Sequence, residues 1–357
     1  MPAAMSVVEE TMSYEEQTHA LRLAIIGVGI AGQSHLLDAI TASGIDVVAV
    51  CASQQASAAQ VASDFGIAAA YSDVSQMLRE QQPEAVVVAT PPSLLALHTA
   101  ACLEAHADVL VEKPLAASQR DLNRISTLLS SSGRRLVVAY TRRYRRAWYT
   151  ASRWLSTGRI GSVNQILCHW QGPYRWRYAP AASTYRANPA KRAAGILLDS
   201  GSHILDALLY LTGQLGTIIS AALEIDELTQ ADVAARIVLQ QSSGVRVSII
   251  IEDGHEEEQR LVTIQGQSGT ITLDEQGATL TTAEDTIYIP DGYRARPVDD
   301  LLSLRHNHPI HGTSFEEACA IVTCLLRIYE RARHPLLRSP RWFRPRAKVL
   351  ARLSGAC

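Results

Sequence analysis

The stretch LRLAIIGVGIAGQSHLL, from Leu21 to Leu37, decides the fold, because an apolar run leads into three spaced glycines and then into a helical pattern. The spacing Gly27-x-Gly29-x-x-Gly32 is the pattern that joins the first strand to the first helix in dinucleotide-binding folds. Gly27 permits the tight turn, Gly29 lets the backbone approach a pyrophosphate, and Gly32 lets the helix pack closely on the strand. Free N–H groups at the start of such a helix attract phosphate. The stretch therefore predicts an α/β domain of the Rossmann type that binds a dinucleotide.

Short apolar runs alternate with amphipathic runs from residue 21 to about residue 140. This alternation is typical of a doubly wound parallel sheet, which has helices on both faces. We therefore place a dinucleotide-binding domain at residues 21–141. The predicted strands are 21–26, 46–51, 68–71, 85–90, 108–112 and 135–140, and the predicted helices are 55–65, 75–81, 94–105 and 119–131.

The pattern changes after residue 150 to long stretches in which apolar and polar residues alternate one by one. Such alternation is typical of consecutive antiparallel strands. We therefore predict an α+β domain with an open, mainly antiparallel sheet over residues 142–357, which binds substrate and forms the oligomer. Helices are predicted near 199–212 and 314–333. The predicted strands are 163–179, 217–227, 232–240, 244–252, 260–265, 270–273, 278–281 and 286–289.

Length and composition limit the classes of protein to consider. The 357 residues suit two domains, and 47% hydrophobic residues with 19% charged residues supply two substantial cores. A net charge of -2 and a pI near 6.6 give no electrostatic reason to expect nucleic acid or a membrane as a partner. No stretch approaches the roughly 20 apolar residues of a membrane helix. Residues 1–20 are acidic and are expected to form a flexible leader, while six scattered cysteines fit a reduced, cytoplasmic protein.

Two further signatures carry acid–base side chains: EKP at residues 112–114 and DSGSHILD at residues 199–206. Histidine is suited to accept a hydroxyl proton because its pKa lies near working pH. A lysine ammonium such as that of Lys113 stabilises a developing alkoxide. Asp199 and His203 are four residues apart, so they share one face at a helix start. The alternative is a structural pair, with Asp199 as an N-cap and His203 as a hydrogen-bonded core histidine.

The signatures occur in a fixed order, with Thr90-Pro91 after the fourth predicted strand and GRIG at 158–161 after the crossover to the second domain. In this arrangement the sequence resembles the glucose–fructose oxidoreductase/inositol dehydrogenase (Gfo/Idh/MocA) family, from about residue 21 to residue 333. The resemblance implies hydride transfer between NAD(P) and a ring carbinol carbon of a sugar, amino sugar or cyclitol. It also implies that Lys113 hydrogen-bonds the reacting oxygen, His203 exchanges its proton and Asp199 binds a neighbouring hydroxyl.

The predicted cofactor site leaves the choice between NAD and NADP open. Ala52, Ser53 and Gln54 follow the second predicted strand, where an acidic residue would bind the adenosine ribose of NAD. There is no acid to exclude a 2′-phosphate and no arginine to bind one, so either cofactor fits, with NAD slightly favoured. The expected cofactor-binding residues are Gly27, Gly29, Ile30, Ala31, Gly32, Ser53, Gln54, Thr90, Pro91, His98, Glu112 and Lys113.

Aromatic and basic residues alternate from Tyr174 to Tyr178, and at strand period this gives one aromatic face and one cationic face. One interpretation is an aromatic stripe in the core with solvated arginines outside it. In the other interpretation, an aromatic ring stacks on substrate carbons, and basic side chains contact hydroxyls or an anionic group such as phosphate or carboxylate. The expected substrate-binding residues are Lys113, Arg143, Tyr174, Lys191, Asp199, His203 and His308.

The cluster of His306, His308 and His311 raises the question of zinc, but Pro309 interrupts the local geometry and no nearby acid or cysteine completes a site. We therefore expect no metal. Two other functions remain open: a redox-neutral glycosidase that uses bound NAD transiently, and a non-catalytic dinucleotide sensor. The sensor is disfavoured because both the lysine and the histidine are present. An open apolar sheet face in the second domain predicts a homodimer or homotetramer.

Overall fold

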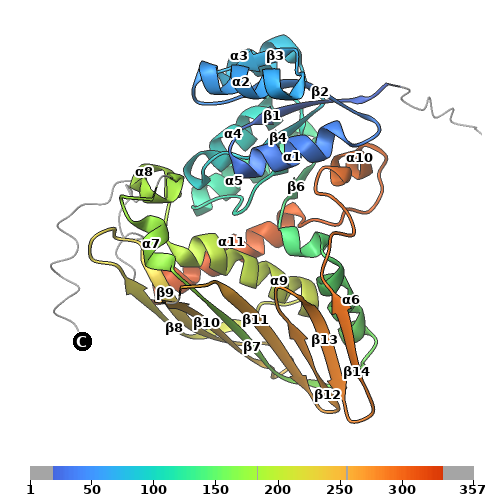
Figure 1. The fold of residues 1–357 in the computed structure, drawn as a ribbon, viewed down its shortest axis with the longest axis vertical. Helices are drawn as coiled ribbons and strands as arrows, with labels where there is room; N and C mark the ends of the chain where they lie inside the picture. Colours follow the sequence, from blue (N-terminus) through green and yellow to red (C-terminus); the bar gives the residue numbers. More distant parts are fainter. Residues whose placement is uncertain (1–18, 183, 255, 333–357) are drawn as a thin grey trace, which may run out of the picture.

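The computed structural model describes residues 19–182, 184–254 and 256–332 as two domains, one above the other in Figure 1. The arginine-rich segment after residue 335 and nearly all of the predicted leader lie outside the described residues. Among the described helices, none is long and apolar enough to cross a membrane.

The first domain contains a six-stranded parallel sheet in the order β3-β2-β1-β4-β5-β6. This is the strand order of a doubly wound dinucleotide-binding fold, so the predicted fold of this part of the chain is confirmed. The strands are β1 Leu21–Ile26, β2 Ile45–Cys51, β3 Ala69–Tyr71, β4 Ala85–Val88, β5 Asp108–Val111 and β6 Leu136–Val138. The helices are α1 Ile30–Ile40, α2 Gln55–Phe65, α3 Val74–Gln81, α4 Pro92–Glu104 and α5 Gln119–Ser132.

The strand order places the ligand-binding edge of this sheet. β4 and β5 are buried along their whole length, as expected of central parallel strands covered on both faces. The direction of strand addition reverses between β1 and β4, and the crevice at the carboxyl ends of these strands is where doubly wound sheets bind ligands. The glycine stretch follows β1 at this edge, and residues 112–114 follow β5.

The second domain contains an eight-stranded sheet in the order β14-β13-β12-β11-β7-β10-β9-β8. Only the β7–β10 pair is parallel, so the predicted open, mainly antiparallel sheet is confirmed. The strands are β7 Val163–Gly172, β8 Thr217–Ile225, β9 Asp232–Gln240, β10 Arg246–Asp253, β11 Gln259–Gly266, β12 Gly269–Leu273, β13 Gly277–Thr282 and β14 Thr286–Pro290. The helical segments are η1 Thr141–Tyr144, α6 Arg146–Ser156, α7 Tyr174–Tyr178, η2 Tyr185–Ala187, α8 Pro189–Arg192, η3 Leu197–Gly201, α9 Ser202–Thr212, α10 Asp299–Arg305 and α11 Phe315–Arg331.

The two faces of the second sheet differ in what covers them. Helices α6, α9 and α11 pack together on one face (Figure 1). Val233, Ile237 and Ile249 are buried on this covered face. Val238 and Ile250 alternate with them along the same strands, and they are only half-buried. The second face is therefore open to a partner or to solvent among the described residues.

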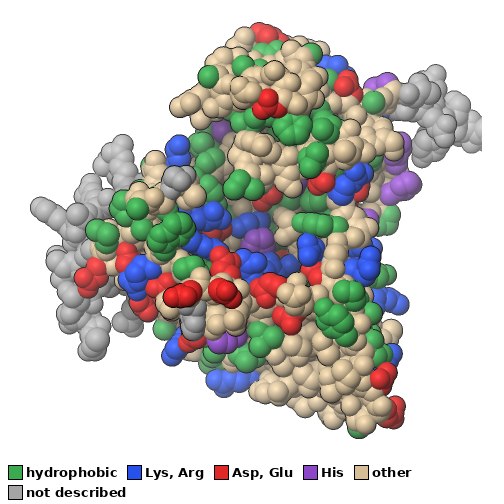
Figure 2. All heavy atoms as spheres, in the orientation of Figure 1, with side chains coloured by type: hydrophobic (Ala, Val, Ile, Leu, Met, Phe, Trp, Pro, Cys, Tyr) green, Lys and Arg blue, Asp and Glu red, His purple; other side chains and the backbone are tan. Residues whose placement is uncertain are grey.

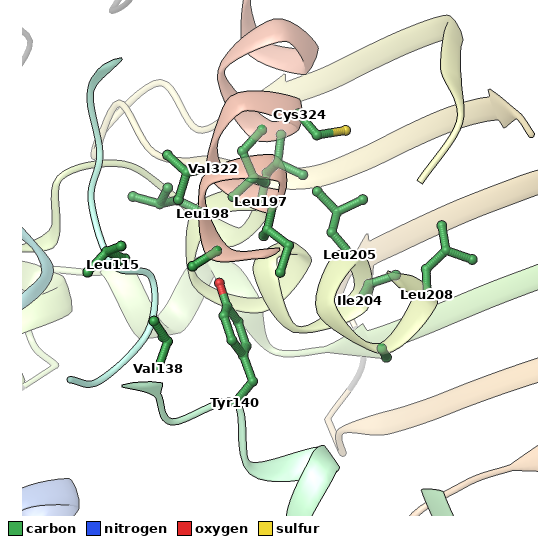
Figure 3. Packing of buried hydrophobic residues seen from close by; sticks show 14 of the residues in the cluster. Leu115, Val138, Tyr140, Leu197, Leu198, Ile204, Leu205, Leu208, Val322 and Cys324 are labelled. Carbon is green, nitrogen blue, oxygen red and sulfur yellow. The ribbon is translucent and has the colours of Figure 1, made fainter. Parts of the chain in front are cut away.

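The hydrophobic core is continuous between the two domains. Figure 3 shows Leu197 and Leu205 packed beside Val322 of α11, with Leu115 and Val138 of the first domain in the same cluster. All of these side chains are buried. Because the segment before α9 lies inside this cluster, its backbone position is fixed relative to both domains.

The predicted strand at 163–179 is wrong beyond residue 172. β7 ends at Gly172, and the segment Tyr174–Tyr178 forms the short helix α7. Pro173 lacks the N–H group that would continue the strand pairing, which explains the early end. Trp176 is 65% exposed, whereas both tyrosines of the segment are buried, so the aromatic residues do not share one face. Helices α6, α8 and α10 were not predicted.

Over residues 19–332, the chain crosses between the domains three times. It leaves the first domain after β6, returns from β14 to α10, and leaves again before α11. Val298 and Leu301, at the start of α10, belong to the same buried cluster as side chains of β1 and β4. The backbones of Val138 and Thr313 exchange two hydrogen bonds, of 2.9 and 3.1 Å, which tie the first crossing to the third. The division of the sequence at residue 142 did not anticipate the return of α10.

Candidate active site

The turn after β1 is tight at two glycines and open at the third. Gly27 has a φ of 97°, and a Cβ added to Gly32 would lie 1.8 Å from the carbonyl oxygen of Gly27. Both positions therefore require glycine. By contrast, a Cβ added to Gly29 would meet no described atom within 4 Å. The space beside Gly29, at the start of α1, is therefore open, as we expect of a pyrophosphate site.

Other predicted cofactor residues surround the same sheet edge. Ser53 and Gln54 are exposed directly after β2 and before α2. Thr90 follows β4, and its Oγ1 lies 3.2 Å from His98 Nδ1 on α4. These residues are near the ends of β2 and β4, where the motif arrangement placed them.

Glu112, also a predicted cofactor contact, already has a partner. Its Oε1 lies 2.8 Å from Nε2 of His35 on α1. Burial acts to raise the pKa of Glu112, but the hydrogen bond and charge of His35, together with Lys113, outweigh burial and lower the pKa below its ordinary value. Glu112 is therefore an ionised carboxylate that fixes α1 against the end of β5.

A cavity of about 540 Å³ lies where the two domains meet. Lys113 lines it from the first domain, and Asp199 and His203 line it from the second, so the three predicted catalytic residues share one cavity. Of the side chains that the structure describes, six cationic and four acidic ones line this cavity. Figure 2 shows Lys and Arg side chains, with acidic and histidine side chains among them, in the hollow between the upper and lower parts of the molecule.

Asp199 holds two cations at the cavity wall. Lys113 Nζ donates to Asp199 Oδ1 at 2.9 Å and to the Asp199 carbonyl oxygen at 2.9 Å. Arg186 Nε donates to Oδ2 at 2.6 Å. Burial alone would raise the pKa of Asp199, but the charges of Lys113 and Arg186 outweigh burial and hold it well below its ordinary range. Asp199 therefore stays ionised and fixes the position of the Lys113 ammonium.

His203 is placed as a neutral base. The Tyr140 ring lies edge-on at 5.7 Å between centroids, and the Trp170 ring lies at 6.5 Å. Its Nδ1 is buried and has no hydrogen-bond partner among the described residues, which differs from the hydrogen-bonded core histidine considered as the alternative. Burial, and then the charges of Lys113 and Arg142, lower the pKa of His203 well below its ordinary value. The imidazole is therefore neutral at pH 7, which is the form that accepts a proton.

A π-helical turn, Leu197–Gly201, presents Asp199 to the cavity. Asp232 on β9 is fully buried, and it accepts hydrogen bonds from the N–H groups of Gly195 (2.9 Å) and of the first residue of the turn (2.7 Å). Tyr329 Oη donates to the same carboxylate at 3.0 Å. A Cβ on Gly195 would lie 2.2 Å from the Asp232 carbonyl oxygen, so the close approach requires glycine. Asp232 therefore anchors the turn.

Arg143, a predicted substrate contact, lies in a buried ion-pair network outside the cavity lining. It donates from Nε to Asp206 Oδ1 at 2.8 Å and from Nη1 to Glu317 Oε2 at 2.8 Å. Thr313 Oγ1 donates to the same Asp206 oxygen at 2.7 Å. Burial raises the pKa of Asp206 to about 6 although Arg143 opposes this rise. The network joins η1 to α9 and α11. Asp206, the last residue of the DSGSHILD signature, therefore has a structural role as the partner of Arg143 and Thr313.

Three more predicted substrate contacts also lie outside the cavity lining. Tyr174 is fully buried, and Arg177 lies over its ring. Lys191 and His308 are exposed. No group of three His, Cys, Asp or Glu side chains within the described part of the chain is arranged to hold a metal ion.

The structure adds Arg142, Arg186 and Arg260 to the cavity. The sequence analysis noted basic residues near 140–146, but residues 141–144 form a 3-10 turn in which successive side chains point about 120° apart. Only one of two adjacent arginines can then face the cavity, and the sequence does not say which. Arg186 lies on the short turn η2 and Arg260 on β11, and neither carried a motif signal.

The parallel sheet with its glycine turn and the open, mainly antiparallel sheet define a two-domain protein whose first domain has a dinucleotide-binding fold. Residues 21–140 match the family model described as "Oxidoreductase family, NAD-binding Rossmann fold". Residues 148–272 match the model of the GFO/IDH/MocA C-terminal domain. The chain belongs to the GFO/IDH/MocA oxidoreductase family, as its motifs predicted.

Relatives in this family act on cyclitols and sugars. The chain is 28% identical over 196 residues to a scyllo-inositol 2-dehydrogenase (NADP(+)) of Bacillus subtilis, covering 54% of this chain and 52% of that protein. It is 28% identical over 194 residues to a D-glucoside 3-dehydrogenase of Escherichia coli, covering 54% of each. The chain thus spans about half the length of these relatives. The crystal structure of an aldose-aldose oxidoreductase from Caulobacter crescentus shares the fold, with a TM-score of 0.77 and 18% identity over 88% of this chain and 98% of that one.

Proposed function

We propose that the protein is an NAD(P)-dependent dehydrogenase that oxidises or reduces a ring carbinol of a sugar, amino sugar or cyclitol. The placement of Lys113, Asp199 and His203 around one cavity, beside the carboxyl ends of the Rossmann strands, carries this proposal. The names of the inositol and glucoside dehydrogenases among its relatives support the class of substrate.

The residues of the first domain fit a nicotinamide dinucleotide. The open space beside Gly29 and the N–H groups at the start of α1 would hold its pyrophosphate. Ser53 and Gln54 would contact the adenosine ribose, and neither excludes a 2′-phosphate, so NAD is only the first cofactor to test. When bound, the cofactor supplies the hydride acceptor for oxidation or the donor for reduction.

Three side chains then handle the substrate hydroxyls. Asp199 atoms occupy two of the three Lys113 N–H donors, which leaves one to donate to the reacting oxygen and stabilise its charge. Neutral His203 accepts the hydroxyl proton during oxidation and returns it during reduction. Asp199 Oδ2 accepts one bond from Arg186 and has a lone pair left for a neighbouring hydroxyl.

The proposal is tested by absorbance of reduced nicotinamide. The purified chain is mixed with NAD or NADP and with sugars, amino sugars, cyclitols and their anionic derivatives. At least one ring alcohol should reduce the cofactor. The exposed Arg146, outside the cavity, provides the control Arg146→Gln, which should retain the rate. Cleavage of a glycoside without reduced cofactor would instead indicate a redox-neutral glycosidase, and tight dinucleotide binding without turnover would indicate a sensor.

A further inference from the structure

Arg142 is a cation without an anion. Its side chain lines the cavity but forms no hydrogen bond or ion pair with any described residue. The acidic groups with the strongest electrostatic effect on it are Asp206 and Glu275, and neither contacts it. Burial, and then the charge of Arg260, lower the pKa of Arg142 below its ordinary value. An unpaired, partly desolvated cation of this kind is stabilised when an anion binds beside it.

The other cations of the cavity already have carboxylate partners. Lys113 and Arg186 share Asp199, at 2.9 and 2.6 Å. Arg145 pairs with Asp291 at 2.6 Å. Arg177 and Arg260 both contact Glu258.

Among the described residues, the charges of this region leave an excess of one cation. Asp274 and Glu275 also line the cavity. Together with Asp199, Asp291 and Glu258, they give five carboxylates against six cations. The unbalanced charge therefore suits a monoanion, and Arg142 is the cation that lacks a contact.

Arg142 is also held in a defined position. Its guanidinium carbon lies 4.4 Å from the centroid of the Trp170 ring and 5.3 Å from that of Trp148. Such cation–π contacts favour a fixed side chain, and a guanidinium has N–H donors in a planar fork that matches a carboxylate. Arg260 lies over the same Trp170 ring at 5.3 Å and adds positive charge nearby.

Trp170 contacts both Arg142 and His203, and this limits the distance between Arg142 and the hydroxyl that His203 would deprotonate. The ring of Trp170 has Arg142 over it and His203 beside it, at 6.5 Å between ring centroids. Because both side chains contact the same ring, we expect a group bound by Arg142 to be attached to the reacting ring or to lie within a few bonds of it. None of the predicted pyrophosphate contacts from Gly27 to Gly32 lines this cavity, so the expected anion is not part of the cofactor.

We propose that the substrate carries a carboxylate on the same ring as the reacting carbinol, as in a hexuronate or a hydroxylated cyclohexane carboxylate, and that Arg142 binds this carboxylate. This inference rests on the proposed dehydrogenase function and narrows its substrate class. It makes Arg142 a specificity-determining residue for that reaction.

Paired ligands test the proposal by binding. Calorimetry of the full chain with NAD present compares D-glucuronate with D-glucose, D-galacturonate with D-galactose, and quinate with myo-inositol. At least one acid should bind about 10- to 100-fold more tightly than its neutral counterpart, the usual worth of a charge-assisted hydrogen bond. A panel in which no acid binds more tightly than its neutral counterpart would overturn the proposal.

Variants of Arg142 test whether this residue causes the preference for the acid over its neutral counterpart. Arg142→Gln should weaken binding of the preferred acid by the same 10- to 100-fold and leave binding of the neutral counterpart unchanged, while Arg142→Lys should retain part of the preference. Arg146→Gln removes an equal charge from the exposed start of α6 and should have no effect. A preference that survives in Arg142→Gln, with normal thermal unfolding, would refute the role of Arg142.

The two proposals fail in different ways. Reduced nicotinamide formed only from neutral sugars or cyclitols would contradict the carboxylate and leave the dehydrogenase in place. An Arg142-dependent acid preference in calorimetry, with no hydride transfer from any ligand, would contradict the dehydrogenase and leave the carboxylate site in place.

Discussion

The basicity of His203 depends on charges that the substrate itself would change. Lys113 and Arg142 lower the pKa of this histidine, whereas Asp199 raises it, and burial is the largest cause of the overall decrease. A carboxylate bound to Arg142 would offset one of the three cations that lower this pKa, since Arg260 also contributes. The pKa of His203 would then rise when substrate enters, so that the histidine becomes a better proton acceptor in the complex than in the free protein.

Substitutions at the cavity should separate the roles of its residues. His203→Ala should lower kcat by about 10²- to 10⁴-fold, the usual worth of general acid–base catalysis. Lys113→Ala should also lower kcat, because charge stabilisation at the reacting oxygen is lost. Asp199→Ala should raise KM as well, because a hydroxyl contact disappears. Steady-state kinetics measures these effects, and fluorescence titration should show unchanged NAD(P)H binding in His203→Ala. A wild-type rate in that variant would leave the histidine only a structural role.

The buried His203 also predicts how stability depends on pH. Its folded pKa lies below the unfolded value of 6.5, so below about pH 6.5 the unfolded chain binds a proton that the folded chain does not. The stabilising effect of the neutral imidazole is therefore complete above pH 6.5 and is lost as pH falls from there. Urea unfolding at several pH values should show a smaller loss of stability between pH 6.5 and 5 in His203→Gln than in the wild type. Equal losses would mean that His203 is accessible to protons in the folded state.

At the scale of elements, the glycines in the turn from β1 to α1 have different roles, because Gly32 is required for the fold and Gly29 for cofactor binding. Gly29→Val should leave thermal unfolding nearly unchanged, because the new side chain meets open space. It should abolish NAD(P) binding in calorimetry, because the side chain fills the space for the pyrophosphate. Gly32→Val is the contrasting variant and should destabilise the fold, because its Cβ would overlap the carbonyl of Gly27. Wild-type cofactor affinity in Gly29→Val would refute the assignment of this loop.

The π-helical turn depends on an anchor that is remote in the sequence. Tyr329→Phe removes a hydroxyl that donates to Asp232 and accepts the N–H of Leu198 at 3.2 Å. We expect a loss of about 1–3 kcal/mol in the free energy of unfolding, measured with urea. We also expect a lower kcat with unchanged cofactor affinity, because the turn presents Asp199. The control Tyr288→Phe removes a half-exposed hydroxyl on β14 and should change neither; equal effects of the two variants would contradict the anchor.

Elements with a clear periodicity of apolar residues were predictable. Elements fixed by contacts with residues remote in the sequence were not. Helix α2 and strand β9 match their predicted ranges, because local apolar patterns determine them. Tyr174–Tyr178 alternates like a strand, yet Pro173 and burial of its tyrosines make it a helix. For α10, the decisive contacts come from strands more than 150 residues earlier in the chain.

The candidate site shows the same division between motif and packing. Lys113, Asp199 and His203 stand in recognisable motifs, and they share one cavity in the structure. Arg142 and Arg143 are chemically equivalent in the sequence. They differ only because Asp206 and Glu317, from α9 and α11, surround one of them. No local pattern carries that information.

At the scale of the whole molecule, the uncovered sheet face predicts self-association. Val238 and Ile250 lie on this face and are only half-buried, whereas their neighbours on the other face are covered by helices. Light scattering at micromolar concentration should report a dimer or tetramer. A double substitution of both residues by lysine should produce monomers, whereas Leu228→Lys, at a 77% exposed position in a turn, should not. A monomeric wild type would contradict the prediction.

The three crossings between the domains constrain how the molecule can open. Two domains joined by one segment can rotate relative to each other in many directions. Three connecting segments allow far fewer relative rotations. The hydrogen bonds between Val138 and Thr313 hold two of these three connections side by side. Arg142 is four residues beyond Val138 in the first crossing, so it lies close along the chain to this pairing. Opening of the domains would therefore move the outer edge of the cavity more than it moves Arg142. The cofactor would then exchange while Arg142, which is proposed to bind the substrate carboxylate, keeps its position.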